Sequence, residues 1–264
     1  MLLVSVLLTL VALIAGLIDA IAGGGGLLTV PALLVAIADP RLALGTNKGQ
    51  AVFGSGASLL AYVRAGRVDK ARFWPTFLAA GVGSALGARL LLAARPEVIR
   101  PVVLVLLLGV AAFFAWRGKS RPKKVAPDKQ EAPRRPLAVA VQNPRLVAVA
   151  IALVIGAYDG FFGPGTGTFL IVLYTSVFGD DLTRATANAK VANFASNLTA
   201  MASFALAGQI DFRLALPMAF AQAVGGVLGA RAAVRGGEKL IRITVLAVSL
   251  ALASRIAYQI VASR

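Results

Sequence analysis

The chain has 264 residues, of which 58% are hydrophobic and only 14% are charged, and its mean hydropathy is +0.82. Soluble domains are about 45–50% apolar and about 25% charged, so the composition excludes an ordinary soluble enzyme, and the long apolar runs exclude a disordered chain. Because the runs are continuously apolar rather than alternating, they also argue against a transmembrane barrel. The composition predicts an all-α polytopic membrane protein that is surrounded by a lipid bilayer.

Cysteine and histidine are both absent from the sequence. Their absence removes disulfides, thiol nucleophiles, the commonest metal ligand and the usual general base. We therefore expect no metal site, no cofactor and no enzymatic activity. The net charge of +16 comes mostly from basic residues in short connections between apolar runs, where the positive-inside rule explains them. A nucleic-acid partner is therefore not expected.

In chain order, apolar segments are predicted at 2–22, 27–38, 40–64, 73–94 and 98–116, and again at 137–162, 167–178, 182–207, 212–234 and 239–261. The second segment of each set is too short to cross a hydrocarbon core, which needs about 20 residues. Each short segment follows a glycine-rich break. This pattern predicts a helical hairpin with a glycine tip at the start of each set.

The two sets resemble each other in sequence, as Gly16–Asp19 resembles Gly156–Asp159 and Leu86–Arg89 resembles Leu228–Arg231. A match at a nearly constant offset predicts an internal duplication. The loop 64–72 is basic, but its counterpart 208–213 is neutral overall, so equivalent loops are expected on opposite sides of the membrane. We therefore predict two inverted repeats of about four helices, at 1–116 and 137–264, which are joined by a basic cytoplasmic linker at 117–136.

The glycine tips are the first candidate for a binding site. A turn at membrane depth frees backbone N–H groups, glycine lets a ligand approach the backbone, and the start of the next helix attracts an anion. Tight helix packing is the alternative, because small residues let membrane helices approach. Clustering in both halves favours a substrate site made by Gly23, Gly24, Gly25, Gly26, Gly163, Gly165, Thr166 and Gly167.

Two lysines provide the second candidate. Asp39 with Pro40, and Asp181, are typical of helix starts, and Lys48 and Lys190 follow roughly eight to nine residues later, or about 12–14 Å into the membrane. A lysine near the midplane is costly and is a functional candidate by default. Two such lysines near two glycine tips predict an anion site. Neighbouring amides and hydroxyls could also donate to an oxyanion, and these are Thr46, Asn47, Thr186, Asn188, Asn193 and Asn197.

Asp19 and Asp159 lie well inside apolar runs. Carboxylates inside a membrane are candidates for proton coupling. They could instead cap the glycine turns or pair with a lysine, and the sequence alone leaves these roles open.

At these residues the chain resembles the TauE/SafE sulfite exporter family, and the sequences of its motifs are most similar to those of the YfcA-like branch. The resemblance rests on GLIDAIAGGGGLLTVP at 16–31, GTNK at 45–48, GAYDGFFGPGTGT at 156–168 and ATANAKVANFASN at 185–197. It implies movement of small sulfur-containing anions such as sulfite or sulfonates. Pro164 and Asn188 stand opposite Gly24 and Thr46, so we expect two half-sites of unequal chemistry.

The sequence and the resemblance together predict a secondary transporter, an exporter in a bacterial inner membrane, with a small anion as its partner. An anion channel, or a transporter of another small organic anion, is the alternative, and an intramembrane enzyme is less favoured because no histidine or cysteine is available. A homodimer could form through the small-residue faces at Gly81–Gly87 and Gly225–Gly229, although packing of these faces within one subunit is the favoured alternative.

Overall fold

The computed structural model describes residues 2–95, 97–99, 101–103, 105–106, 109–110 and 143–262. All regular structure in these ranges is helical, which confirms the predicted all-α class. The predicted linker at 117–136 and residues 137–142 of the second repeat lie outside the described residues. The helices are α1 (Leu2–Ala22), α2 (Gly26–Ala36), α3 (Pro40–Arg64), α4 (Lys70–Ala93), α6 (Pro144–Phe161), α7 (Thr166–Phe178), α8 (Leu182–Leu206) and α9 (Phe212–Ala262).

Helix ends follow local signals that are visible in the sequence. The Asp39 carboxylate accepts a hydrogen bond from the Arg41 N–H at 2.9 Å, and the Asp181 carboxylate accepts one from the Arg184 N–H at 2.8 Å. Both predicted N-caps are therefore confirmed. The short helices α2 and α7 have 11 and 13 residues. The long α9 bends at Gly237, where φ is 55°, and this bend separates the two predicted segments 212–234 and 239–261.

Among the described residues, four helices are long and apolar enough to cross a membrane, namely Leu2–Ala22, Lys70–Ala93, Pro144–Phe161 and the first arm of α9, Phe212–Gly237. Their outward faces carry exposed apolar side chains such as Leu3 (71%), Val154 (64%) and Phe220 (77%). Apolar surface on this scale suits contact with lipid rather than water. Helices α3 and α8 have 25 residues each but are more polar, and their polar side chains point into the protein.

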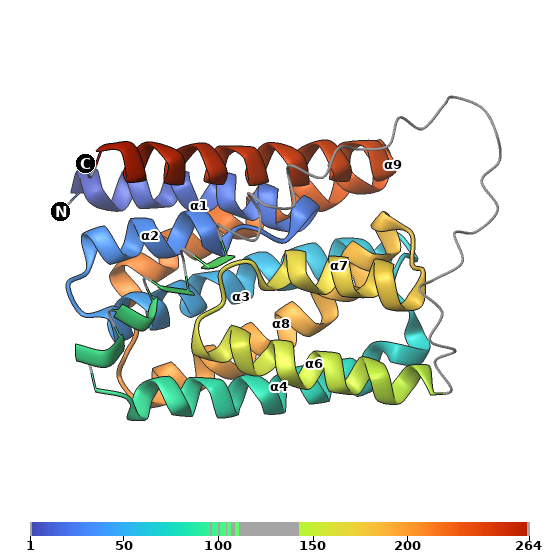
Figure 1. Ribbon diagram of the computed structural model, residues 1–264, viewed down its shortest axis with the longest axis horizontal. Coiled ribbons are helices and arrows are strands. Elements are labelled where there is room, and N and C mark those ends of the chain that lie inside the picture. The colour runs from blue at the N-terminus through green and yellow to red at the C-terminus, as the bar shows by residue number, and fades with distance from the viewer. Residues whose placement is uncertain are drawn as a thin grey trace.

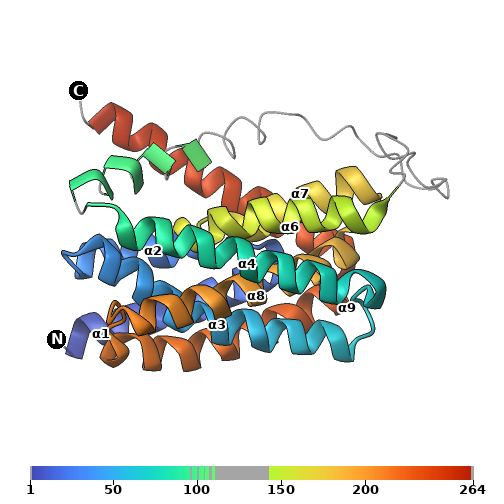
Figure 2. The same cartoon turned by 90° about the horizontal axis from the view of Figure 1, so that it is seen from below.

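Helices α3 and α8 form the centre of the bundle. Helix α1 packs on α9, α4 packs on α6, and α3 and α8 contact each other between these two pairs. Figure 1 shows α3 and α8 between α1 at the top and α4 with α6 at the bottom. In the perpendicular view of Figure 2, the α3–α4 loop lies at the end of the bundle opposite to both chain ends.

Glycines bring the outer helices into close contact. A Cβ added at Gly83 would lie 2.1 Å from the Leu153 carbonyl oxygen, so α4 touches the backbone of α6. A Cβ added at Gly225 would lie 2.1 Å from the Leu13 carbonyl oxygen, which gives α9 the same relation to α1. The small-residue faces are therefore used for packing within the subunit.

Candidate anion-binding site

Two buried ion pairs connect the two halves of the chain. The Lys48 Nζ lies 2.8 Å from the Asp159 Oδ1, and the Lys190 Nζ lies 2.7 Å from the Asp19 Oδ2. The two lysines are only 2% and 0% exposed. Each lysine comes from a central helix of one half, and each aspartate comes from the first helix of the other half. Both lysines thus have a partner in the protein interior, where an unpaired charge would be very costly.

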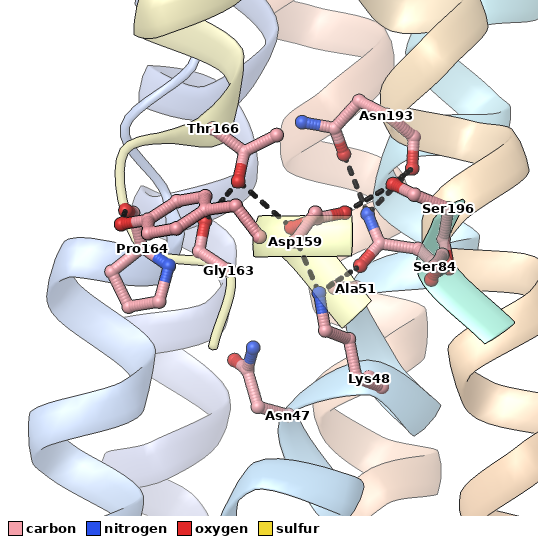
Figure 3. A network of polar contacts seen from close by, with 12 residues as sticks. Asn47, Lys48, Ala51, Ser84, Asp159, Gly163, Pro164, Thr166, Asn193 and Ser196 are labelled. Atoms are coloured by element: carbon pink, nitrogen blue, oxygen red, sulfur yellow. Dashed lines mark hydrogen bonds and ion pairs between the residues drawn. The ribbon is translucent and has the colours of Figure 1, made fainter. Parts of the chain in front are cut away.

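Asp159 is held by several donors besides Lys48. Its Oδ1 accepts a hydrogen bond from the Thr166 hydroxyl at 3.0 Å, and its Oδ2 accepts one from the Ser196 hydroxyl. The Lys48 ammonium also donates to the Asn197 side-chain oxygen at 3.2 Å. Figure 3 shows Lys48 reaching toward Asp159, with Thr166 and Ser196 on opposite sides of the carboxylate. Lys48 and Asp159 therefore belong to one network of side-chain hydrogen bonds.

Asp19 combines two of the roles that the sequence left open. It pairs with Lys190 through Oδ2, and its Oδ1 accepts a hydrogen bond from the Gly25 N–H at 3.3 Å. The carboxylate thus satisfies a backbone donor of the glycine turn while it neutralises a buried lysine. Asp19 has fewer hydroxyl and amide neighbours than Asp159, so the two half-sites differ in chemistry.

A small cavity lies between the two glycine turns. Its volume is about 20 Å³, little more than one water molecule requires, so an anion of several heavy atoms needs the site to open. Within the described ranges, no group of three carboxylates offers a metal site. The cavity lining is mostly polar and consists of Asp19, Gly23, Gly26, Thr29, Asn47, Lys48, Ala51, Asp159, Gly163, Asn193, Asn197 and Gln222.

The tips of the two glycine turns touch each other beside this cavity. Gly23 has φ of 77°, and a Cβ added there would lie 2.3 Å from the Gly167 carbonyl carbon. A Cβ added at Gly163 would lie 2.8 Å from the Lys48 Nζ. The glycines therefore serve tight packing, which is one of the two roles considered from the sequence, and Gly163 also lets the backbone approach Lys48.

Gly23→Ala is expected to destabilise the protein by clearly more than Gly66→Ala. Both positions have positive φ, which costs a non-glycine residue about 1–3 kcal/mol, but an added Cβ at Gly66 meets nothing within 4 Å. Only the Gly23 substitution forces the two turns apart. Thermal unfolding of the purified variants in detergent measures the difference, and equal losses would show that the contact between the turns is not important for stability.

A second polar network lies where the α3–α4 loop meets the start of α8. The Arg72 Nη2 contacts both oxygens of Asp180 at 2.9 and 2.8 Å, and the Arg72 Nε contacts the Asp69 Oδ2 at 2.8 Å. Partial burial alone would raise the pKa of Asp69, but hydrogen bonds from Arg72 and from the backbone N–H of Ala71 outweigh it and lower that pKa. This network ties the two halves together at one end of the bundle.

Thr46 and Asn188 stabilise loops of the opposite halves. The Asn188 side-chain oxygen accepts a hydrogen bond from the Asp69 N–H at 2.9 Å, and the Thr46 hydroxyl accepts one from the Asp211 N–H at 3.0 Å. Thr186 donates to the Leu182 carbonyl of its own helix at 2.7 Å. These three side chains are engaged in structural contacts and are not among the described residues that line the cavity.

Comparison with known proteins identifies the family. The sulfite exporter TauE/SafE family model matches residues 8–256. The chain belongs to the TauE/SafE family. It is 36% identical to the "Probable membrane transporter protein ORF9" of Sinorhizobium sp., with 93% of this chain and 89% of the relative covered. It is 34% identical to a "Probable membrane transporter protein" of Haemophilus influenzae, with 94% and 92% covered.

A third relative is the "Probable membrane transporter protein YfcA" of Escherichia coli, which is 34% identical over 94% of this chain and 87% of the relative. This similarity supports the resemblance to the YfcA-like branch that the sequence motifs indicated. No solved structure matches the chain. The TauE/SafE relatives are named as transporters, so the chain is a membrane transporter of this family rather than an enzyme.

In this TauE/SafE protein, the cavity unites about half of the residues that the sequence singled out. Lys190 and Thr166 do not line the cavity but donate hydrogen bonds to the aspartates that do. The Gly25 N–H donates to Asp19, and the carbonyl groups of Gly24 and Gly165 accept backbone hydrogen bonds from the helices that follow them. Three polar residues of this region were not predicted from the sequence, namely Thr29, Ser196 and Gln222. Each is a polar residue inside a predicted apolar segment, and this is the signal that could have found them.

Proposed function

We propose that the protein is a secondary transporter that exports small sulfur-containing anions, such as sulfite or small sulfonates, across the bacterial inner membrane. One observation carries the proposal: a lysine that is 2% exposed lines a polar cavity between two glycine turns. An ammonium suits a small oxyanion, and amide and hydroxyl side chains can donate to its oxygens. The name of the sulfite exporter family supplies the substrate class.

Inverted repeats provide the route across the membrane. The reciprocal ion pairs Lys48–Asp159 and Lys190–Asp19, together with the matching contacts of α4 with α6 and of α9 with α1, support two related halves with opposite orientation. In transporters of this kind the substrate lies near the midplane between the repeats, and one half rocks against the other. The site then opens to each side in turn.

Asp159 couples this movement to protons. The ammonium of Lys48 is already neutralised by the carboxylate of Asp159, so an anion can take its place only when Asp159 is displaced or neutralised. Adding one negative charge to two lysines and two aspartates leaves a buried net charge, which is costly at membrane depth. Uptake of one proton by Asp159 restores neutrality. Asp19 also faces the cavity, but its charge remains balanced by Lys190.

The test is anion flux in liposomes that contain the purified protein. Sulfite, thiosulfate, sulfate, a small sulfonate and a small carboxylate are compared, with and without a pH gradient. We expect saturable flux of sulfite or the sulfonate, which a pH gradient accelerates and which shows counterflow. Single-channel currents without counterflow would indicate an anion channel, and flux of carboxylates alone would move the substrate to another class of organic anion.

A further inference from the structure

Gln222 is a buried polar side chain of the central cavity that comes from α9. It is 3% exposed and is one of the cavity-lining residues. Two glycines make room for it: a Cβ added at Gly54 would lie 2.4 Å from the Gln222 Cγ, and one added at Gly16 would lie 2.9 Å from the same atom. The amide therefore occupies a space that α1 and α3 leave free for it.

The side-chain oxygen of Gln222 has no hydrogen-bond partner among the described residues. Other polar groups of the cavity are engaged: the Asn47 oxygen accepts from Thr29 and Gln50, and Asn197 contacts both Lys48 and Asn193. A buried amide oxygen without a donor destabilises the protein unless something else compensates for it. A ligand that brings its own donor would supply that compensation.

Packing does not explain why this residue is a glutamine. In the other half, Ala80 on α4 has the same relation to Gly156 that Gln222 has to Gly16: an added Cβ would lie 2.5 Å from the Ala80 carbonyl oxygen and 2.4 Å from the Gln222 carbonyl oxygen. The helix contact therefore forms equally well with a methyl group. The amide is an addition to one half, and it reaches the same cavity as Lys48.

We propose that Gln222 contacts the substrate and selects anions that carry their own hydrogen-bond donor, such as hydrogen sulfite. The negative charge of the ion pairs with Lys48 and its O–H donates to the Gln222 Oε1. This inference rests on the proposed function, because it assumes that the cavity binds a small sulfur oxyanion. It goes further by assigning the protonated form and the residue that recognises it.

The test compares two monoanions of similar size at one mildly acidic pH: hydrogen sulfite, which has an O–H, and methanesulfinate, which has a methyl group in place of that hydroxyl. We expect the wild type to bind hydrogen sulfite about tenfold more tightly, the effect of one buried hydrogen bond. Gln222→Met removes the amide but keeps the side-chain length. It should abolish the preference by weakening hydrogen sulfite binding about tenfold while methanesulfinate binding stays unchanged.

Two further variants serve as controls. Gln222→Asn keeps an amide and should retain part of the preference, and its monodisperse elution reports on folding. Gln209→Met makes the same chemical change at another glutamine with an unpartnered buried oxygen, in the α8–α9 loop away from the cavity lining, and should behave as wild type. Unchanged preference in Gln222→Met would overturn the inference while leaving the proposed function intact. Binding of neither anion by the wild type would overturn both.

Discussion

Neutralising the Lys48–Asp159 pair is expected to weaken anion binding strongly, whereas the same change in the Lys190–Asp19 pair is expected to have a much smaller effect. The two double variants are Lys48→Met with Asp159→Asn, and Lys190→Met with Asp19→Asn. Each removes one positive and one negative charge from a buried pair, at distances of 2.8 and 2.7 Å. The chemical change is therefore matched, and the variants differ only in which pair they remove.

The reason for the difference is the position of the two lysines. Lys48 lines the cavity, while Lys190 is 0% exposed and is not one of the cavity-lining residues in the described part of the chain. Removing a charge that faces a bound ion costs about 2–5 kcal/mol, which corresponds to a loss of at least about 30-fold in affinity. The Lys190 double variant should stay within about tenfold of wild type.

Double variants are preferable to single ones because of folding. Lys190→Met alone leaves the Asp19 carboxylate buried without its partner, and such a change costs about 3–5 kcal/mol. An asparagine at either position can still accept hydrogen bonds, including the one from the Gly25 N–H to residue 19. Sulfite binding and thermal unfolding are measured on each purified variant. Equal loss of binding in both double variants would contradict the assignment of Lys48 as the contact residue.

The local parts of this site could be predicted from the sequence. Helix starts at Asp39 and Asp181 depend on a side chain and the backbone two or three residues later, so a short motif identifies them. The depth of the two lysines follows directly from those starts. Both are buried, at 2% and 0% exposure. Such predictions need only the geometry of one helix.

The pairing of charges could not be predicted, because it depends on how distant segments pack. Lys48 and Asp159 are 111 positions apart, and Lys190 and Asp19 are 171 apart. The sequence also placed Thr46 and Asn188 with the lysines because they are close in the chain. Residues two apart on a helix face different directions, and in the structure these two side chains contact the loops at Asp211 and Asp69.

Asp159→Asn is expected to separate anion movement from proton movement. The amide oxygen can still accept hydrogen bonds from Lys48 and Thr166, so the network of Figure 3 is retained. The site loses one negative charge, however, and an anion can then neutralise Lys48 without a proton. Transport by the variant should therefore carry a net negative charge, whereas wild-type transport of a monoanion with one proton carries none.

A small sulfonate is the most informative probe for this prediction, because it stays a monoanion across the working pH range and any proton that moves must be held by the protein. Accumulation of the sulfonate in wild-type liposomes should increase with the pH gradient and should not depend on a membrane potential set with potassium and valinomycin. In Asp159→Asn accumulation should be independent of the pH gradient and should change with the potential by about 50-fold per 100 mV. Asp211→Asn makes the same change at a helix start, where the side chain accepts from the Arg213 N–H, and should match wild type. A pH response that persists in Asp159→Asn would show that another group carries the proton.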